Sequence, residues 1–432
     1  MGCLELIQPS MIQSPQLRRA LITVLLAFAI ANAFLLWNAR DMIRQGYGGF
    51  SAFYTAGKML VSGHGRSLYN LHAQWELQRQ FAPQVKIRSG PLPYVRPPFE
   101  AMLFAPFTLF SYSNAILLWT MLKLAILAAI PWMVSRAASS SREFSPWLLA
   151  VLSFGTYPVF VDFEQGHDSV LLAFLFAVAF VSLAKGREHT AGFVLGLALF
   201  KLHFVIPFVA ILWIAGKRRL VASFATAALA LFAASLAIVG WNGLMGYPHY
   251  VLALNRSLGA GMVTPEYQIN LRGLFTLFIG RSAQLGAWQW LLLLVALAGI
   301  LWGGYLWKKS GDRNLPEAFG FALIVSILTS LYAYSYDLTL LLVPLFSALT
   351  GGLRPESFSI PARLGPYPPE TPPRVPDRFT RACTIVGILL LLCTPLYWLL
   401  KLRWQAEYLV TLPLALLAFG LSRRLKNLAT HA

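Results

Sequence analysis

The segment from residue 191 to residue 216 reads AGFVLGLALFKLHFVIPFVAILWIAG and predicts how the chain is organised. Its two apolar runs, 191–200 and 203–216, flank Lys201. Each run is too short to cross a hydrocarbon core of about 30 Å, which needs about 20 helical residues. Basic residues precede and follow the pair, so both ends are expected on the cytoplasmic side. We therefore interpret the segment as one helical hairpin that enters from the cytoplasm, with Lys201 near its tip.

Similar apolar runs fill most of the 432-residue chain, in which 57% of the residues are hydrophobic and only 12% are charged. This balance excludes a soluble globular protein. Because lipid offers the backbone no hydrogen-bonding partner, runs that cross a membrane are expected to be helices. We predict an all-α, polytopic integral membrane protein with about 12 membrane helices, including the short hairpin segments. The runs are 20–37, 113–134, 146–161, 169–184, 191–200, 203–216, 220–240, 287–307, 317–334, 338–350, 382–400 and 408–421.

Basic residues outnumber acidic residues by 35 to 17, which gives a formal net charge of +18. They lie in short clusters between the apolar runs, a pattern that indicates membrane topology rather than nucleic-acid binding. The alternation of these clusters places both termini in the cytoplasm and the long loops 38–112 and 241–286 outside. Loop 38–112 is itself basic, but long translocated loops escape the charge bias. The first run, 20–37, is expected to be an uncleaved signal anchor.

Segment 351–381 interrupts the apolar pattern with eight prolines and interspersed charges. This composition cannot pack a core and favours an extended backbone. We predict a cytoplasmic linker that separates a membrane core, residues 1–350, from a C-terminal helix pair, residues 382–432. The sequence shows no internal repeat, which argues against a transporter built from inverted halves.

The chain carries no Walker loop, no Gly-x-Ser-x-Gly elbow and no His-Glu-x-x-His motif. The nearest acidic pair, Asp162 and Glu164, is interpreted as two solvated carboxylates at a helix end. The three cysteines, Cys3, Cys383 and Cys393, have no other metal-ligating residues beside them. We therefore predict no metal, no cofactor and no nucleic-acid partner.

Three ionisable residues, Asp168, Lys201 and Asp337, interrupt or begin apolar runs and map to the external ends of helices. An ionised side chain at the membrane centre costs about 2.5–3.5 kcal/mol on insertion scales, so each should have a partner or a role. Asp168 could simply cap a helix, and Lys201 could extend its ammonium group toward the interface. Convergence of all three on one face favours a functional site.

The first external loop is rich in aromatic residues, proline and arginine, notably around Tyr54, Tyr94 and Arg96. Aromatic faces stack on sugar rings, and Arg binds phosphate through two parallel hydrogen bonds, so the loop suits a sugar-phosphate ligand. Anchoring of aromatic residues at the membrane interface explains the same composition. The sequence leaves both interpretations open.

The order of several short motifs resembles glycosyltransferase family 87, whose members are polytopic enzymes of the GT-C fold. The resemblance covers roughly residues 15–350. The motifs are FSAFYTAG at 50–57, LY at 68–69, YVRPPF at 94–99, GHDSVLL at 166–172, LFK at 199–201, NLRGL at 270–274 and YDL at 336–338.

This resemblance implies a membrane hexosyltransferase of the bacterial inner membrane with an extracytoplasmic active site. The enzyme would transfer a hexose, mannose in the typical members, from a polyprenyl-phosphate sugar to a glycan or glycolipid acceptor, with inversion. Such chemistry needs a carboxylate base and cations for the leaving phosphate, but no nucleotide. The expected partners are the lipid-linked donor, the acceptor and membrane lipids.

The family usually has an Asp, the expected base, immediately before the Phe of its first-loop motif, where this chain has Gly49. Glu100 and Asp168, and after them Asp337, are the substitutes that we expect, because they flank apolar runs at the external face. The alternative functions are a transporter or flippase of a lipid-linked or polar solute, and a catalytically inactive scaffold paralogue.

The remaining site residues follow from the same resemblance and from the charge of the donor. We predict that Arg96, Lys201 and Arg272 converge on one cavity and bind the donor phosphate, which must be neutralised at headgroup depth. The residues expected to bind the sugar or the acceptor are Tyr54, Tyr94, His167 and Asn270.

Overall fold

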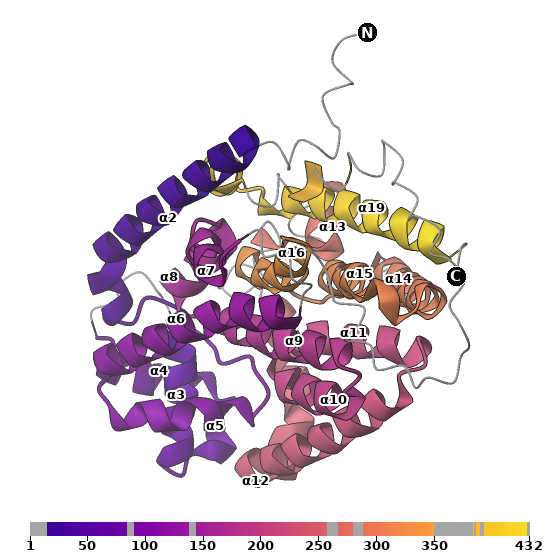
Figure 1. The fold of residues 1–432 in the computed structure, drawn as a ribbon. Coiled ribbons are helices and arrows are strands. Elements are labelled where there is room, and N and C mark those ends of the chain that lie inside the picture. Colours follow the sequence, from indigo (N-terminus) through magenta and orange to yellow (C-terminus); the bar gives the residue numbers. More distant parts are fainter. Residues whose placement is uncertain are drawn as a thin grey trace.

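The computed structural model describes residues 15–83, 90–137, 144–256, 267–279, 288–349, 383, 386–388 and 393–429. Within these ranges the regular secondary structure is all helical and contains no strand (Figure 1), as the apolar patterning predicts. The predicted linker 351–381 lies outside the described residues.

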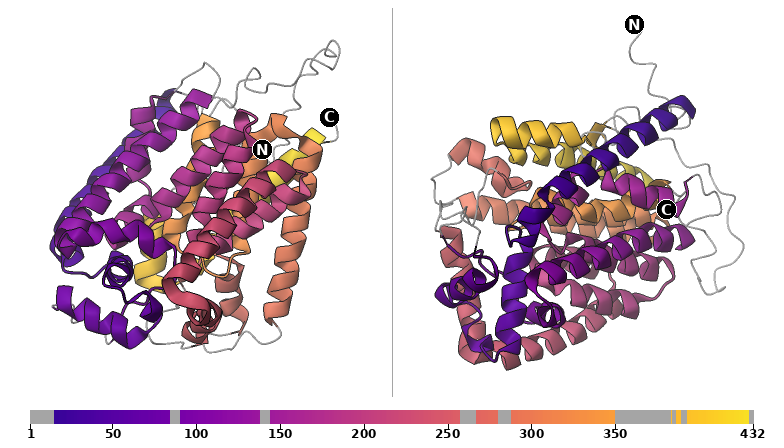
Figure 2. Two further views of the ribbon diagram at one scale, coloured as in Figure 1. Left: turned by 90° about the horizontal axis from the view of Figure 1, so that it is seen from below. Right: turned by 90° about the vertical axis from the view of Figure 1, so that its left-hand side faces the viewer.

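The long helices run side by side, and the short helices of the first loop gather at one end of them (Figure 2). That loop, predicted only as an external connection, folds into five short helices. They are α3 (Phe50–Val61), η1 (Gly65–Ser67), α4 (Leu71–Phe81), α5 (Glu100–Phe104) and η2 (Ala105–Leu109). The other helices up to residue 214 are α2 (Pro15–Arg44), α6 (Tyr112–Ala137), α7 (Pro146–Phe154), α8 (Tyr157–Gln165), α9 (Ser169–Ala184), α10 (Glu188–Leu197), η3 (Ala198–Lys201) and α11 (Leu202–Ile214).

The second half of the chain continues the helical pattern. Its helices are α12 (Arg218–Arg256), α13 (Leu271–Ile279), α14 (Trp288–Ser310), η5 (Asp312–Asn314), α15 (Leu315–Leu328), η6 (Ser335–Leu341), α16 (Leu342–Leu349), α18 (Thr394–Trp398), the π-helix η8 (Leu399–Trp404), η9 (Glu407–Val410) and α19 (Thr411–Ala429).

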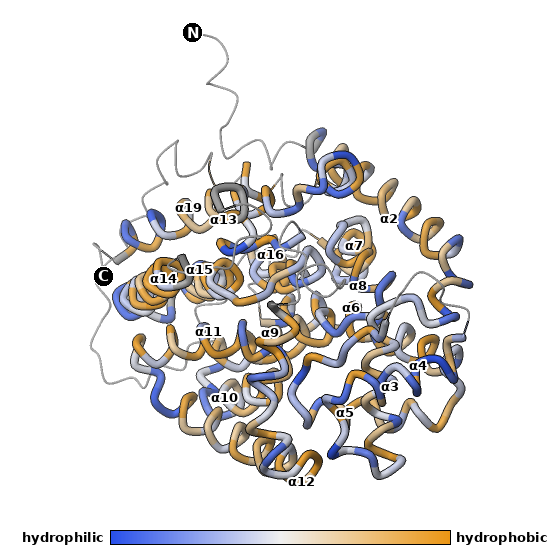
Figure 3. Tube along the Cα trace, turned by 180° about the vertical axis from the view of Figure 1, so that it is seen from behind, coloured by the Kyte–Doolittle hydropathy of each residue, from blue (hydrophilic) through white to orange (hydrophobic). Residues whose placement is uncertain are grey.

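Six helical segments of the described chain are long and apolar enough to cross a membrane, or seven if the bent pair α7–α8 is one span. Several of them expose apolar side chains that only lipid or a partner would cover, such as Phe34 on α2 and Leu294 on α14, which are 64% and 63% exposed. Figure 3 shows that hydrophobic residues predominate along both helices. The predicted count of about 12 includes shorter helices, such as α9 and α15, that fall below this length.

The segment from α10 to α11 is continuous in its helical residues, yet its two ends meet. Lys217, just after α11, places its Nζ atom 3.2 Å from Oε1 of Glu188, the first residue of α10. The segment is therefore a hairpin rather than a single crossing, and Lys201 lies at its turn, as the sequence predicts. Lys217 also pairs with Asp312 of η5.

Helix α12 extends to Arg256, beyond the apolar run 220–240 that predicted it. It bends at Gly240, whose φ of +69° and ψ of 176° are not helical and suit glycine. The part beyond the bend packs onto the first loop, where the ring of Tyr69 lies 5.1 Å from Tyr247 and 5.0 Å from Tyr250, between centroids.

The C-terminal segment packs onto the membrane core. Helix α19 contacts both α14 and α15. The hydroxyl of Ser335 donates a hydrogen bond to Glu407, and Thr411 donates one of 3.1 Å to the carbonyl of Asn270. The segments on the two sides of the predicted linker 351–381 are therefore in contact with each other.

Candidate functional site

Five ionisable residues converge where the first loop meets the ends of α9, the hairpin and η6. Glu100 begins α5, Arg96 lies four residues before it, and Lys201 ends η3. Asp168 precedes the first residue of α9, and Asp337 lies in η6. Gly166 ends α8 in the left-handed conformation, with φ of +68°, and so turns the chain sharply toward Asp168.

Two ion pairs share one oxygen at the centre of this cluster. Oδ1 of Asp168 lies 2.8 Å from Nζ of Lys201 and 3.1 Å from Nη2 of Arg96. Lys201 also lies 2.6 Å from Oδ1 of Asp337, and it donates a hydrogen bond to Ser169. Because buried charges are stable only when paired, these contacts hold four elements in one arrangement.

The Glu100 and Asp168 carboxyl groups differ in protonation. Oε1 of Glu100 and Oδ2 of Asp168 are both buried and have no hydrogen-bonding partner among the described residues. Burial and the negative charge of Asp168 raise the pKa of Glu100 well above its ordinary value. Burial alone would raise the pKa of Asp168 too, but Arg96 and Lys201 outweigh it and hold this pKa below its usual range. Glu100 therefore favours the protonated form, and Asp168 favours the ionised form.

A second buried ion pair lies beside the first, between Lys123 of α6 and Asp162 of α8. Nζ of Lys123 is 2.9 Å from Oδ1 of Asp162, and both side chains are fully buried. Oδ2 of Asp162 accepts a hydrogen bond of 2.8 Å from the backbone N–H of Ser169. The interpretation of Asp162 as a solvated carboxylate is therefore wrong. Asp162 also caps α9, the role considered for Asp168, whose side chain makes no such bond.

His167 stacks on Tyr336, with ring centroids 4.0 Å apart and an angle of 27° between the planes. Its Nε2 lies 2.9 Å from Oε1 of Gln165, whereas Nδ1 has no hydrogen-bonding partner among the described residues. Burial lowers the pKa of His167 well below its ordinary value, so the ring is neutral. Tyr336 in turn stacks on Tyr334 at 5.6 Å between centroids. The sequence analysis did not predict this stack of rings. The signal for it was the alternation of Tyr332, Tyr334 and Tyr336 along the chain.

Arg272 and Asn270 contact the residues just before Tyr332, at the other end of the tyrosine-rich segment 332–336. Arg272 Nη1 donates a hydrogen bond of 3.2 Å to the Leu331 carbonyl, and its guanidinium lies 5.4 Å from the Tyr332 ring centroid. Asn270 Oδ1 accepts a hydrogen bond of 2.9 Å from Gly273 and so caps α13. Arg96 and Lys201 thus meet at Asp168, whereas Arg272 lies against Leu331 and Tyr332.

The two loop tyrosines predicted to bind sugar hold the loop together. The Tyr54 hydroxyl donates to the Phe110 carbonyl at 2.8 Å, and its ring packs on Phe81 and Tyr112. The Tyr94 hydroxyl donates to the Pro97 carbonyl at 2.9 Å. Both side chains are buried.

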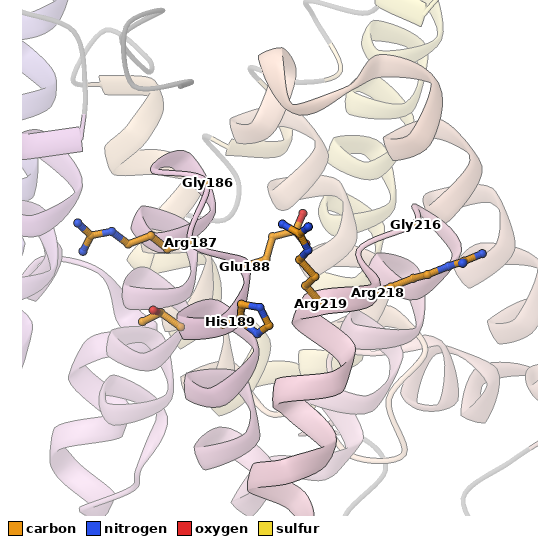
Figure 4. Close-up of a pocket in the computed structure, with 8 residues that line it drawn as sticks. Gly186, Arg187, Glu188, His189, Gly216, Arg218 and Arg219 are labelled. Atoms are coloured by element: carbon orange, nitrogen blue, oxygen red, sulfur yellow. The ribbon is translucent and has the colours of Figure 1, made fainter. Parts of the chain in front are cut away.

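The described residues also form an open surface pocket of about 590 Å³ (Figure 4), lined by the α9–α10 and α11–α12 connections. Asp168 lies at the start of α9 and the pocket at its far end, and a 16-residue helix is about 24 Å long. Figure 4 shows Arg187 and Arg218 pointing in opposite directions, so they do not converge on one ligand. The pocket is separate from the charged cluster.

Comparison with known proteins shows the family to which the chain is similar. The family model for glycosyltransferase family 87 matches residues 94–335, more than half of the chain. The matched range contains Arg96, Glu100, Asp168 and Lys201 and ends two residues before Asp337.

A relative in Mycobacterium tuberculosis (strain CDC 1551 / Oshkosh) is named polyprenol-phosphate-mannose-dependent alpha-(1-2)-phosphatidylinositol pentamannoside mannosyltransferase. It is 26% identical over 244 residues, which are 55% of this chain and 53% of the relative. The chain thus matches about half the length of that relative. No solved structure matches.

Proposed function

The chain belongs to glycosyltransferase family 87, and from this premise we propose that it transfers a hexose, specifically mannose, from a polyprenyl-phosphate donor to a hydroxyl of a glycan or glycolipid, with inversion. The name of the mycobacterial relative supports this donor class and a glycolipid acceptor. The structural observation that carries the proposal is the sharing of Asp168 Oδ1 by Arg96 and Lys201.

During the proposed reaction the phosphate gains negative charge and a proton is released, and the shared oxygen of Asp168 lies between the groups that can respond to both changes. The bond between the anomeric carbon and the phosphate oxygen breaks, and its electron pair stays on the phosphate. A new bond forms from the acceptor oxygen to the anomeric carbon, and the acceptor hydroxyl loses a proton. The phosphate thereby gains one negative charge, and the site must take up one proton.

We assign the proton to the Glu100–Asp168 carboxyl pair, because each group keeps one buried oxygen that has no hydrogen-bonding partner among the described residues. Protonation of Asp168 removes the negative charge that Arg96 and Lys201 share. Arg96 and Lys201 can then bind the leaving phosphate. In this way two cations that are paired with Asp168 before the reaction can stabilise the phosphate as it leaves. Asp337 is less available to the acceptor, because its Oδ1 is bound to Lys201 and its Oδ2 accepts the Tyr334 N–H at 2.9 Å.

The same geometry supports roles for the surrounding residues. His167, stacked on Tyr336, is proposed to contact the sugar or the acceptor. Arg272 is proposed to bind the donor phosphate before transfer, and Asn270 to position the helix that carries Arg272. Tyr54 and Tyr94 then act by holding the loop that carries Arg96, rather than by stacking on sugar.

We propose that the protein lies in the bacterial inner membrane, with both termini cytoplasmic, the charged cluster extracytoplasmic and about 12 apolar segments at membrane depth. Figure 2 supports the placement of the termini, because the start of α2 and the end of α19 lie at the same end of the long helices.

The test is a transfer assay with the purified full chain in lipid nanodiscs. The donor is polyprenyl-phosphate [14C]mannose, and the acceptor is octyl α-mannoside. Transfer by the natural chain, and its loss in Lys201→Met and Arg96→Ala, is the expected result. Transfer from GDP-mannose without the lipid donor would contradict the proposed donor class.

A further inference from the structure

Gly49 and His167 are in direct contact, although they lie in different parts of the sequence. A Cβ atom added to Gly49 would lie 2.7 Å from Cε1 and 3.0 Å from Nε2 of the His167 ring. The backbone does not require glycine here, because φ of residue 49 is −58° and ψ is −25°. The imidazole ring therefore occupies the space that any larger residue at position 49 would need.

Three other side chains fix the orientation of this ring. Tyr336 covers it at 4.0 Å between centroids, and Phe53 meets it edge-on at 6.2 Å. The Gln165 amide oxygen lies 2.9 Å from Nε2. Because an amide oxygen only accepts hydrogen bonds, the ring hydrogen is on Nε2 and the lone pair is on Nδ1.

Nδ1 is buried and has no hydrogen-bonding partner within the described parts of the chain. Burial lowers the pKa of His167, and Lys201 and Arg96 lower it further against the opposing charge of Asp168, so Nδ1 carries no proton. Leaving such a buried acceptor without a hydrogen bond is unfavourable. A ligand that supplies an O–H group would relieve that cost.

We infer that Nδ1 of His167 accepts a hydrogen bond from a hydroxyl of the bound carbohydrate, and that Gly49 is the residue that makes room for the ring to do so. The identity of the ligand rests on the proposed function. The pairing of residue 49 with residue 167 does not, because it follows from packing alone. The two parts therefore need separate tests.

The first test measures thermal unfolding of the full chain in nanodiscs for Gly49→Ala, His167→Ala and the double variant. We expect Gly49→Ala to lower the melting temperature in the natural background and to change it little when residue 167 is Ala. Gly57→Ala is the matched control, because its Cβ would lie 2.8 Å from the backbone carbonyl of Phe104. The control should cost the same in both backgrounds. Equal cost of Gly49→Ala in both backgrounds overturns the pairing.

The second test compares His167→Asn with His167→Gln in the transfer assay with octyl α-mannoside. The Asn amide oxygen takes the place of Nδ1, whereas the Gln amide takes the place of Nε2. If Nδ1 is the working atom, Asn retains about tenfold more kcat/KM than Gln, the size of one hydrogen bond. A purely packing role would favour Gln, which is closer to His in size, and that order refutes the role of Nδ1. A natural chain that transfers no mannose overturns the proposed function, while the unfolding test still decides the pairing.

Discussion

Removing the charge of Lys201 is the most direct test of the buried cluster. Arg96 and Lys201 balance Asp168 and Asp337, so Lys201→Met leaves one buried negative charge without compensation. The Lys201 side chain is only 1% exposed, and removing one partner of a buried pair costs about 3–5 kcal/mol. We therefore expect Lys201→Met to lower the free energy of unfolding by about that amount.

Lys217→Met is the matched control, because Lys217 also joins two acidic residues, Glu188 and Asp312, from different elements. Its side chain is 14% exposed and Asp312 is 39% exposed, so water screens this network. A cost of about 1 kcal/mol is expected, as for surface pairs. Unfolding by SDS in mixed micelles, followed by tryptophan fluorescence, measures both variants.

The double variant Lys201→Met/Asp337→Asn restores the balance of charge and decides whether charge is the cause. It should recover at least half of the stability lost in Lys201→Met, because Asp168 keeps Arg96 as its partner. A double variant less stable than the single one, or equal costs for Lys201→Met and Lys217→Met, would refute the reasoning.

Three further predictions concern the neighbouring residues. The pKa of Glu100 is higher in the folded chain than in the unfolded chain, so the stability that its protonated form contributes falls as pH rises above the ordinary glutamate pKa and toward the raised one. The natural chain should therefore lose thermal stability over this range of pH while Glu100→Gln does not; parallel curves would contradict this. Asp162→Asn should cost about 3 kcal/mol, since it leaves Lys123 buried and unpaired, and Lys123→Met added to it should recover part of the loss in the same SDS titration. Arg272→Ala should raise KM for the polyprenyl-phosphate donor by about tenfold with a smaller change in kcat, a split that steady-state kinetics would reveal.

The sequence predicts the all-helical class, because the backbone of an apolar run in lipid must form its hydrogen bonds within the segment, but it does not predict the five helices of the first loop. It also predicts that Asp168, Lys201 and Asp337 converge, since an ionised group at membrane depth needs a partner. It does not reveal Lys123, which lies in the middle of an apolar helix and pairs with a residue 39 positions away. Nor does it show that Tyr54 and Tyr94 point into the loop, because composition fixes which residues are present but not which way a side chain faces.

Helix α11 is held by a lysine just outside each of its ends. Lys201 ties the start of the helix to α9 and η6, and Lys217 ties its end to α10 and η5. Sliding α11 along its axis by one turn would break both sets of contacts together, so we expect this helix to keep its position. A rocking transporter would need such a helix to move. We therefore expect any movement that admits a substrate to involve other elements, such as α12, whose helical geometry is interrupted at Gly240.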